Sequence, residues 1–124
     1  MDNPGQRAED RALITDALAK YAWGYDEGDF DLLGDSFTDD AVAFGKVANT
    51  DLGWGPLRGR AEIVQTLANI RAGQTDQRRH TISSFLFDEL AGSAARVRCM
   101  LVLIATENGV PRLVSAGWYR CSMV

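Results

Sequence analysis

The sequence predicts one α+β domain, with helices in its first half and an antiparallel sheet in its second. Two patterns predict this arrangement. Apolar residues recur at helical spacing before Gly73, and after Gly73 long apolar segments alternate with tight-turn signals. The 124 residues, 46% of them hydrophobic, suffice for a single core, so residues 1–124 are expected to fold as one domain.

Three helices are predicted in the first half. The first covers residues 10–25, where one face presents apolar side chains at i, i+4, i+7 and i+11: Ile14, Leu18, Tyr21 and Tyr25. Asp29 can cap a short second helix over 30–33. The third covers 60–71, and four of its apolar residues are expected to point inward: Ile63, Val64, Leu67 and Ile70.

One short and three long strands are predicted around the third helix. Residues 41–47 form the short strand, and residues 48–59, rich in Gly, Asn, Asp and Pro, form a loop that carries Trp54 and Leu57. The long strands cover 80–88, 95–106 and 113–123, and the segments Ala91-Gly-Ser93 and Asn108-Gly109 provide the turns between them.

The turn positions predict a register for the sheet. With Asn108-Gly109 as turn centre, Cys99 lies opposite Trp118, and a similar argument places His80 opposite Leu103. The face toward the helices then holds His80, Ile82, Ser84, Cys99, Leu101, Leu103, Val114, Ala116 and Trp118. The other face holds Phe85, Phe87, Met100, Val102, Ile104, Leu113, Tyr119 and Cys121. A slip of one residue would exchange the faces. In this register Cys99 and Cys121 lie on opposite faces and cannot form a disulfide.

Both predicted faces are apolar in mid-strand, whereas an antiparallel sheet with one wet face alternates between apolar and polar residues. Helices can cover only one face in a chain of this length. The second face is therefore expected to pack against another copy, giving a homodimer or a higher homo-oligomer.

Charge, hydropathy and cysteine content indicate the cellular location and the classes of partner that are excluded. The net charge is −4, without the basic face that nucleic-acid binding needs. The longest apolar run, residues 99–105, is far shorter than the roughly 20 residues that span a bilayer. The N-terminal segment is polar, and two cysteines without metal-ligand spacing suit a reducing compartment. A cytoplasmic protein with no nucleic-acid or membrane partner is expected.

Few residues can carry chemistry. The sequence has no nucleotide-binding glycine motif, no G-x-S-x-G and no H-E-x-x-H, and it has one histidine. The carboxylates of Asp26, Glu27, Asp29 and Asp31 lack the spacing of a calcium loop. No metal and no cofactor are expected.

Asp26 and His80 are the main catalytic candidates. Asp26 lies four residues after Ala22, so it can share the inward face of the first helix. Taken alone, an aspartate here is more often a helix-end residue that binds nearby backbone amides. His80 starts a strand on the predicted helix-facing side and could be an ordinary half-buried histidine. If the two side chains meet, the carboxylate fixes the ring tautomer and the imidazole becomes a general base.

Other residues are candidates for the walls of the site. Tyr25 or Tyr21 could donate a hydrogen bond to a substrate oxygen, although both could simply pack on the helix face. Six further residues are expected to line the substrate pocket or to pack in the core, because they are large aromatics or lie on the predicted helix-facing side of the sheet. They are Trp23, Trp54, Ser84, Cys99, Leu101 and Trp118.

Four segments resemble the SnoaL-like domains of the nuclear-transport-factor-2-like superfamily, over nearly the whole chain. They are Ala19–Leu33, Phe37–Val42, Gly59–Ile63 and the strand start at Arg79–His80. The pattern Tyr-Asp-x-x-Asp-aromatic-Asp over Tyr25–Asp31 is most similar to scytalone dehydratase and its relatives.

The resemblance implies a cone-shaped, curved antiparallel sheet wrapped around N-terminal helices, with an apolar pocket at the open end. It also implies that Asp26 orients His80 as a proton-abstracting base beside Tyr25. The second histidine of the dehydratase pocket has no counterpart within residues 99–105. Family members usually continue with one further pairing strand, so a C-terminal strand is expected to be missing after Val124.

The sequence thus predicts a cofactor-independent, dehydratase-like lyase or isomerase that abstracts a proton from a hydrophobic cyclic small molecule. A non-catalytic small-molecule-binding or oligomer-forming subunit is the alternative, and a polyketide cyclase is a further one. Fold alone does not choose among them.

Overall fold

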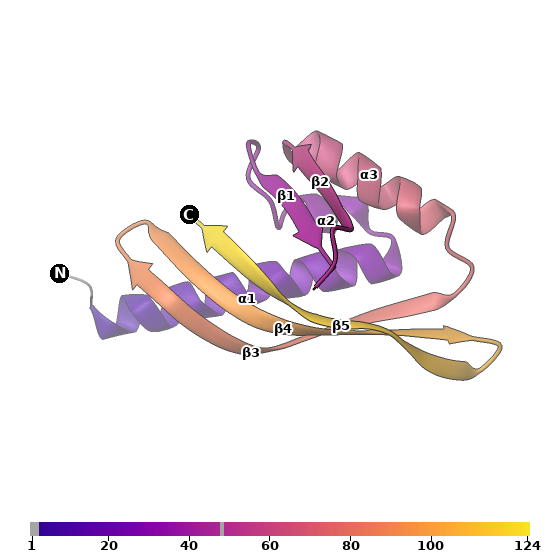
Figure 1. Cartoon of the computed structure of the whole chain (residues 1–124). Coiled ribbons are helices and arrows are strands. Elements are labelled where there is room, and N and C mark those ends of the chain that lie inside the picture. The colour runs from indigo at the N-terminus through magenta and orange to yellow at the C-terminus, as the bar shows by residue number, and fades with distance from the viewer. Residues whose placement is uncertain (1–2, 48) are drawn as a thin grey trace.

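The computed structural model describes residues 3–47 and 49–124, and Figure 1 shows helices followed by a curved antiparallel sheet, as predicted. The elements in chain order are α1 (Pro4–Glu27), α2 (Phe30–Gly34), β1 (Val42–Lys46), β2 (Gly53–Arg58), α3 (Arg60–Ala72), β3 (Gln77–Ala91), β4 (Ala94–Glu107) and β5 (Val110–Met123). Strands β3, β4 and β5 form one sheet in that order, and β1 and β2 form a separate hairpin. The sheet runs along α1, and the hairpin, α2 and α3 gather near the C-terminal end of that helix.

Helix α1 is longer than the apolar stripe that predicted it. Asn3 caps its N-terminus, because its side chain accepts a hydrogen bond from the backbone N–H of Gln6 at 3.0 Å, and Pro4 follows in the first turn. The helix ends at Gly28, which adopts a left-handed conformation at φ 70°. The capping residues therefore set the ends of the helix, and the apolar stripe sets the face that it buries.

The other two helices lie where the sequence places them. The side chain of Asp29 caps α2 by accepting a hydrogen bond from the N–H of Leu32 at 3.1 Å. In α3, Ile63 is buried, but Ile70 is 53% exposed. The prediction that Ile70 points inward is therefore wrong.

Strand β2 replaces most of the predicted 48–59 loop, of which Ala48 lies outside the described residues. Trp54 and Leu57 lie on this strand and pair with Gly45 and Ala43 of β1. The glycines and the proline of Gly53–Arg58 favoured a loop, but the pairing contains an irregularity between Ala43 and Gly45 that accommodates them.

The pairing of β3 with β4 confirms that His80 lies opposite Leu103, and it places Ile82 opposite Leu101. The turn itself is tighter than predicted, since Ala91 pairs with Ala94. Two irregularities in β3 absorb the difference, one between Ser83 and Leu86 and one between Phe87 and Glu89. The register is thus right at His80, although the sequence did not predict these bulges.

The first β3 bulge also changes the faces of Ser84, Phe85 and Phe87. Ser84 adopts φ 58° and is exposed, so its predicted place on the helix-facing side is wrong. Phe85 and Phe87 pack against the buried core, on the face opposite to the predicted one. A bulge shifts the alternation of side chains by one residue, which explains both errors.

A third bulge corrects the predicted register of β5. The predicted pairing holds from Glu107–Val110 to Ile104–Leu113, and then Leu103 pairs with Ser115. Beyond this point Cys99 pairs with Tyr119, and Met100 pairs with Trp118. Trp118 is consequently on the outer face, and Tyr119 is on the face toward α1.

The two cysteines lie on the same face, contrary to the prediction. Cys121 pairs with Val97, which lies two residues before Cys99 on the same face of β4. The two cysteines are therefore diagonal neighbours on adjacent strands. Both are free. The neighbouring Cys121 thiol and burial raise the pKa of the Cys99 thiol.

The core lies between α1 and the inner face of the sheet. Leu18, Val97 and Cys99 form its buried centre. The half-buried residues packed against them are Ile14, Ile82, Phe85, Phe87, Tyr119, Cys121 and Met123. On the outer face, exposed apolar side chains occupy successive strand pairs: Met100 with Trp118, Val102 with Ala116, and Ile104 with Leu113.

Candidate functional site

The side chains of Asp26 and His80 form a buried pair between α1 and β3. The Nδ1 atom of His80 lies 2.6 Å from Oδ1 of Asp26. The backbone N–H of His80 also donates to Oδ2 of Asp26 at 2.8 Å. Only 5% of the Asp26 side chain and 8% of the His80 side chain are exposed. One carboxylate therefore fixes both the imidazole ring and the start of the strand that carries it.

The helical period places Asp26 in this position. Ala22, Tyr25 and Asp26 are buried on one face of the last turns of α1, whereas Trp23 and Glu27 face outward. The helix then ends through two backbone hydrogen bonds, from Gly28 N–H to the Tyr25 carbonyl and from Asp29 N–H to the Gly24 carbonyl. Because the left-handed residue closes the helix directly after this turn, the carboxylate projects from a fixed end.

The second ring nitrogen of His80, Nε2, is the atom that can act as a base. In residues 3–47 and 49–124, no buried side-chain nitrogen or oxygen lacks a hydrogen-bond partner, and Nε2 makes none of the hydrogen bonds found. Nε2 is therefore not a fully buried atom. With Nδ1–H donating to the carboxylate, Nε2 carries the free lone pair and can accept a proton.

Tyr25 lies next to the imidazole. The ring centroids of Tyr25 and His80 are 5.2 Å apart in an edge-to-face arrangement. The Tyr25 hydroxyl donates to Oε1 of Gln74 at 3.1 Å. Burial raises the pKa of Tyr25, and the positive charges of Arg78 and Arg71 partly oppose this. A neutral phenol in this position is a hydrogen-bond donor over the physiological pH range.

Tyr21 and Tyr119 complete an aromatic wall around the imidazole. Tyr21 packs edge-to-face on His80 at 5.8 Å and on Tyr119 at 6.0 Å. Burial raises the pKa of Tyr21 and of Tyr119. The sequence missed Tyr119, because the β5 bulge moves it to the inner face.

Two residues of the segment that ends α3 also reach the site and were missed. Arg71 donates to the backbone carbonyls of Tyr25 and Asp26, and Gln74 accepts from Tyr25. No local pattern pointed to either residue. Their role depends on the packing of α3 against the end of α1, which a linear sequence does not display.

The other predicted wall residues divide into two groups. Cys99 and Leu101 lie on the inner face of the sheet, as expected. Trp23 is 60% exposed on α1, Trp118 is 57% exposed on the outer sheet face, and Ser84 is exposed at the β3 bulge. These three residues do not contribute to the surroundings of Asp26 and His80.

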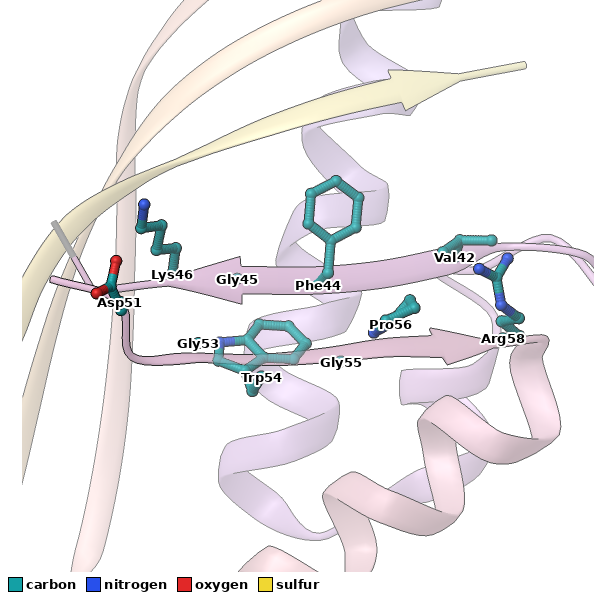
Figure 2. A pocket seen from close by; sticks show the side chains of 10 residues that line it. All are labelled: Val42, Phe44, Gly45, Lys46, Asp51, Gly53, Trp54, Gly55, Pro56 and Arg58. Atoms are coloured by element: carbon teal, nitrogen blue, oxygen red, sulfur yellow. The ribbon is translucent and has the colours of Figure 1, made fainter.

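Trp54 lies elsewhere, in an open hollow of about 770 Å³ on the β1–β2 hairpin. Figure 2 shows its indole beside Phe44, with Lys46 and Asp51 at one end and Arg58 at the other. The lining includes neither Asp26 nor His80. The predicted association of Trp54 with the two candidate catalytic residues is therefore not seen in the structure.

Solved structures with the same fold include a ligand complex, an NTF2-like protein and a dioxygenase subunit. A protein from Catenulispora acidiphila in complex with S-DNPA is 25% identical, with a TM-score of 0.73 over 93% of this chain and 81% of that one. An NTF2-like protein with a cystatin-like fold from Novosphingobium aromaticivorans is 22% identical, with a TM-score of 0.73 over 98% and 80%. The beta subunit of the benzoate 1,2-dioxygenase from Burkholderia mallei is 18% identical, with a TM-score of 0.69 over 90% and 77%.

These similarities identify an NTF2-like fold. The model of the SnoaL-like domain family matches residues 6–124, and the chain belongs to that family. The family includes isomerases, cyclases and dioxygenase beta subunits, so membership alone does not specify a reaction. Comparison with curated protein sequences gives no match.

Two further findings concern the described residues alone. Within residues 3–47 and 49–124, no three His, Cys, Asp or Glu residues lie close enough together to hold a metal ion. In the same part of the chain, no helix is both long and apolar enough to cross a membrane.

Proposed function

We propose that the protein is a cofactor-independent, dehydratase-like lyase or isomerase that removes a proton from a hydrophobic cyclic small molecule. The observation that carries the proposal is the buried contact of 2.6 Å between Asp26 and His80, in which Nε2 of the imidazole remains unpartnered. The aromatic rings of Tyr21 and Tyr25 beside the imidazole favour a flat, apolar substrate.

In the proposed reaction, Nε2 of His80 takes a proton from a carbon next to a carbonyl or next to a leaving group. The C–H electron pair then moves toward the carbonyl oxygen or expels the leaving group. The Asp26 carboxylate stabilises the imidazolium that forms. The imidazolium returns its proton to another carbon of the substrate in an isomerisation, or to the leaving group in an elimination.

Tyr25 is proposed to donate a hydrogen bond to the oxygen on which charge develops. In the structure its hydroxyl donates to Gln74 instead. Substrate binding would therefore have to exchange one hydrogen bond for another, without moving the ring away from His80. This exchange keeps the tyrosine hydroxyl satisfied before and after the substrate enters.

The test is turnover of a panel of cyclic ketols and cyclic halides by the purified protein and its variants. His80→Ala and Asp26→Asn should each lower turnover by about a hundredfold or more while the circular dichroism spectrum is unchanged. Asp16→Asn is the matched control, because Asp16 is an exposed carboxylate on the same helix that forms an ion pair with Lys20 at 3.8 Å. Unchanged turnover in the His80 variant would rule out the proposed base.

The second candidate function is that of a non-catalytic subunit that binds a small molecule or forms oligomers. One observation favours the formation of oligomers. The outer sheet face exposes three consecutive apolar strand pairs, from Met100–Trp118 to Ile104–Leu113. Exposed apolar surfaces of this kind mark interaction sites. We propose that a second copy of the chain covers this face, in a homodimer or a higher homo-oligomer.

The catalytic and non-catalytic candidates are distinguished by ligand binding without turnover. Calorimetric binding of a cyclic ketol that His80→Ala does not change, together with no turnover, would favour the binding subunit. A polyketide cyclase would need a different acid facing the cavity, and its test is cyclisation of a linear polyketide. We further propose a cytoplasmic location, which is consistent with the two free cysteines.

A further inference from the structure

The last turn of α1, which carries Tyr25 and Asp26, is held by an arginine from another helix. Nε of Arg71 donates to the backbone carbonyl of Tyr25 at 2.8 Å. Nη2 of the same guanidinium donates to the backbone carbonyl of Asp26 at 3.0 Å. One planar group therefore binds two consecutive carbonyls at the C-terminal end of the helix, directly behind the carboxylate that orients His80.

Both the charge and the shape of Arg71 suit this position. The C-terminal end of a helix carries unpaired carbonyls and a partial negative charge, which a cation stabilises. The last turn of α1 has no basic residue of its own. Arg71 supplies that charge from α3, and its fixed planar fork of donors matches two adjacent acceptors, whereas the donors of a lysine ammonium rotate and are not held in that geometry.

The backbone around Gly28 leaves room for the guanidinium. A Cβ atom at Gly28 would lie 2.9 Å from Nη1 of Arg71, and the residue has a positive φ of 70°. Gly28 thus both ends the helix and allows Arg71 to reach the two carbonyls. Three residues further on, Gln74 accepts from the hydroxyl of Tyr25, and its own N–H donates to the carbonyl of Arg71.

We propose that Arg71 is a positioning residue, which sets the end of α1 so that the Asp26 carboxylate meets both the ring and the backbone of His80. This inference rests on the proposed function for its catalytic consequence, but its geometric content can be measured without turnover. Arg71 acts through Asp26 and does not need to touch the substrate.

The test reads the hydrogen bond between Asp26 and His80 by proton NMR. A ring N–H in a contact as short as 2.6 Å gives a strongly deshielded, slowly exchanging resonance, and Asp26→Asn assigns it by removing it. Arg71→Gln is expected to broaden or abolish this resonance while the amide spectrum stays dispersed. Arg71→Lys, which keeps the charge but lacks the planar fork of donors, is expected to weaken the resonance without abolishing it and to report on the role if Arg71→Gln does not fold.

Arg60→Gln is the matched control. Arg60 lies at the other end of α3, binds the backbone carbonyl of Phe37 through Nε at 2.9 Å and Nη2 at 2.7 Å, and pairs with Asp39 at 3.1 Å. None of these bonds involves Asp26 or His80. Arg60→Gln should leave the His80 resonance unchanged. If turnover is found, Arg71→Gln should lower it by about tenfold to a hundredfold, the range for a displaced catalytic group.

The outcomes separate this proposal from the proposed function. An unchanged resonance in Arg71→Gln, an equal loss in Arg60→Gln, or no deshielded resonance in the unaltered protein would overturn the role of Arg71. A resonance that depends on Arg71, in a protein whose turnover does not depend on His80, would support the positioning role and refute the proposed function.

Discussion

The carboxylate of Asp26 binds His80 twice, through the ring nitrogen at 2.6 Å and through the backbone N–H at 2.8 Å. Both oxygens of the carboxylate are therefore used by one residue that lies 54 positions away in the sequence. The first bond sets the ring tautomer, and the second ties the end of α1 to the start of β3. Orientation of the proposed base and stability of the fold depend on the same side chain.

This dual role predicts that Asp26→Asn lowers both activity and stability. The amide offers one acceptor oxygen instead of two, so one His80 N–H loses its partner. Turnover should fall by about 10²–10⁴-fold, the usual contribution of a positioned base. The free energy of unfolding should fall by about 1–3 kcal/mol, the cost of an unsatisfied buried group. The measurements are kcat/KM and urea unfolding.

The double variant Asp26→Asn/His80→Ala provides the check. Residues that act as one unit are strongly non-additive. The double variant should therefore be no slower than His80→Ala alone. If the two effects on kcat/KM multiply, the residues act independently and the paired mechanism is wrong.

Tyr25→Phe tests the proposed role of the hydroxyl. Loss of a donor to a developing oxyanion lowers kcat by about 10²–10³-fold. Gln74→Leu is the control, because it removes only the resting partner of that hydroxyl. It should lower kcat much less. Equal losses in both variants would mean that the hydrogen bond between Tyr25 and Gln74, and not donation to the substrate, is what matters.

The buried tyrosines predict a loss of stability in alkali. Burial raises the pKa of Tyr119 above its ordinary value of 10.0, whereas the unfolded chain ionises near that value. The native state then holds a proton that the unfolded state has lost, so the stabilisation present below pH 10 is lost as the pH rises further. Tyr119→Phe should make the fall above pH 10 shallower, by up to about 1.4 kcal/mol per pH unit for one proton.

Urea unfolding of both proteins at pH 8 and at several values above 10 measures this difference. Titrating groups that do not interact with Tyr119 cancel in the comparison. The difference between the profiles therefore reports on Tyr119 together with its neighbour Tyr21, whose pKa Tyr119 lowers. Parallel pH profiles for the two proteins would show that Tyr119 does not contribute to the alkaline loss.

The close contact between α1 and α2 predicts that one methyl group added at Gly24 strongly lowers the stability of the fold. A Cβ atom at Gly24 would lie 2.5 Å from the backbone nitrogen of Leu33. Gly24→Ala should therefore destabilise the fold by about 1–3 kcal/mol through overpacking. Gly117→Ala is the control, because a Cβ atom there has nothing within 4 Å and should leave stability unchanged or slightly raised. Equal midpoints of thermal unfolding would contradict the close approach of the helices.

The outer sheet face predicts self-association that one substitution disrupts. Trp118→Glu places a charge in the middle of the apolar strand pairs, so the assembly should dissociate to monomers in sedimentation velocity at micromolar concentration. Trp23→Glu is matched in residue type and exposure, at 60% against 57%, but lies on α1. It should leave the sedimentation coefficient unchanged. A monomer before any substitution would refute the assembly.

The sequence anticipated the elements that depend on local patterns. The helical period brought Asp26 to the face shared by Ala22 and Tyr25, and the alternation of β4 placed Cys99 and Leu101 on the inner side. It also placed His80 opposite Leu103, although two bulges in β3 had to compensate for the tighter turn. Helix and turn signals are local, so they can be recognised without knowledge of the fold.

The sheet faces of β5 show where local patterns fail. A single extra residue between Leu113 and Ser115 exchanged Trp118 for Tyr119 on the inner face and brought Cys121 beside Cys99. Because side chains in a strand alternate with a period of two, one bulge reverses every assignment beyond it. Nothing in the composition of β5 indicated its position.

The sequence by itself therefore determined the fold class, the family and the two residues of the candidate pair, since motifs and periodicity are properties of short segments. Only the tertiary structure decided which groups surround that pair. Arg71, Gln74 and Tyr119 come from α3, the segment after it and β5, and they meet the end of α1 through packing between elements. Those contacts depend on bulges and on helix placement, which are settled by the whole core at once.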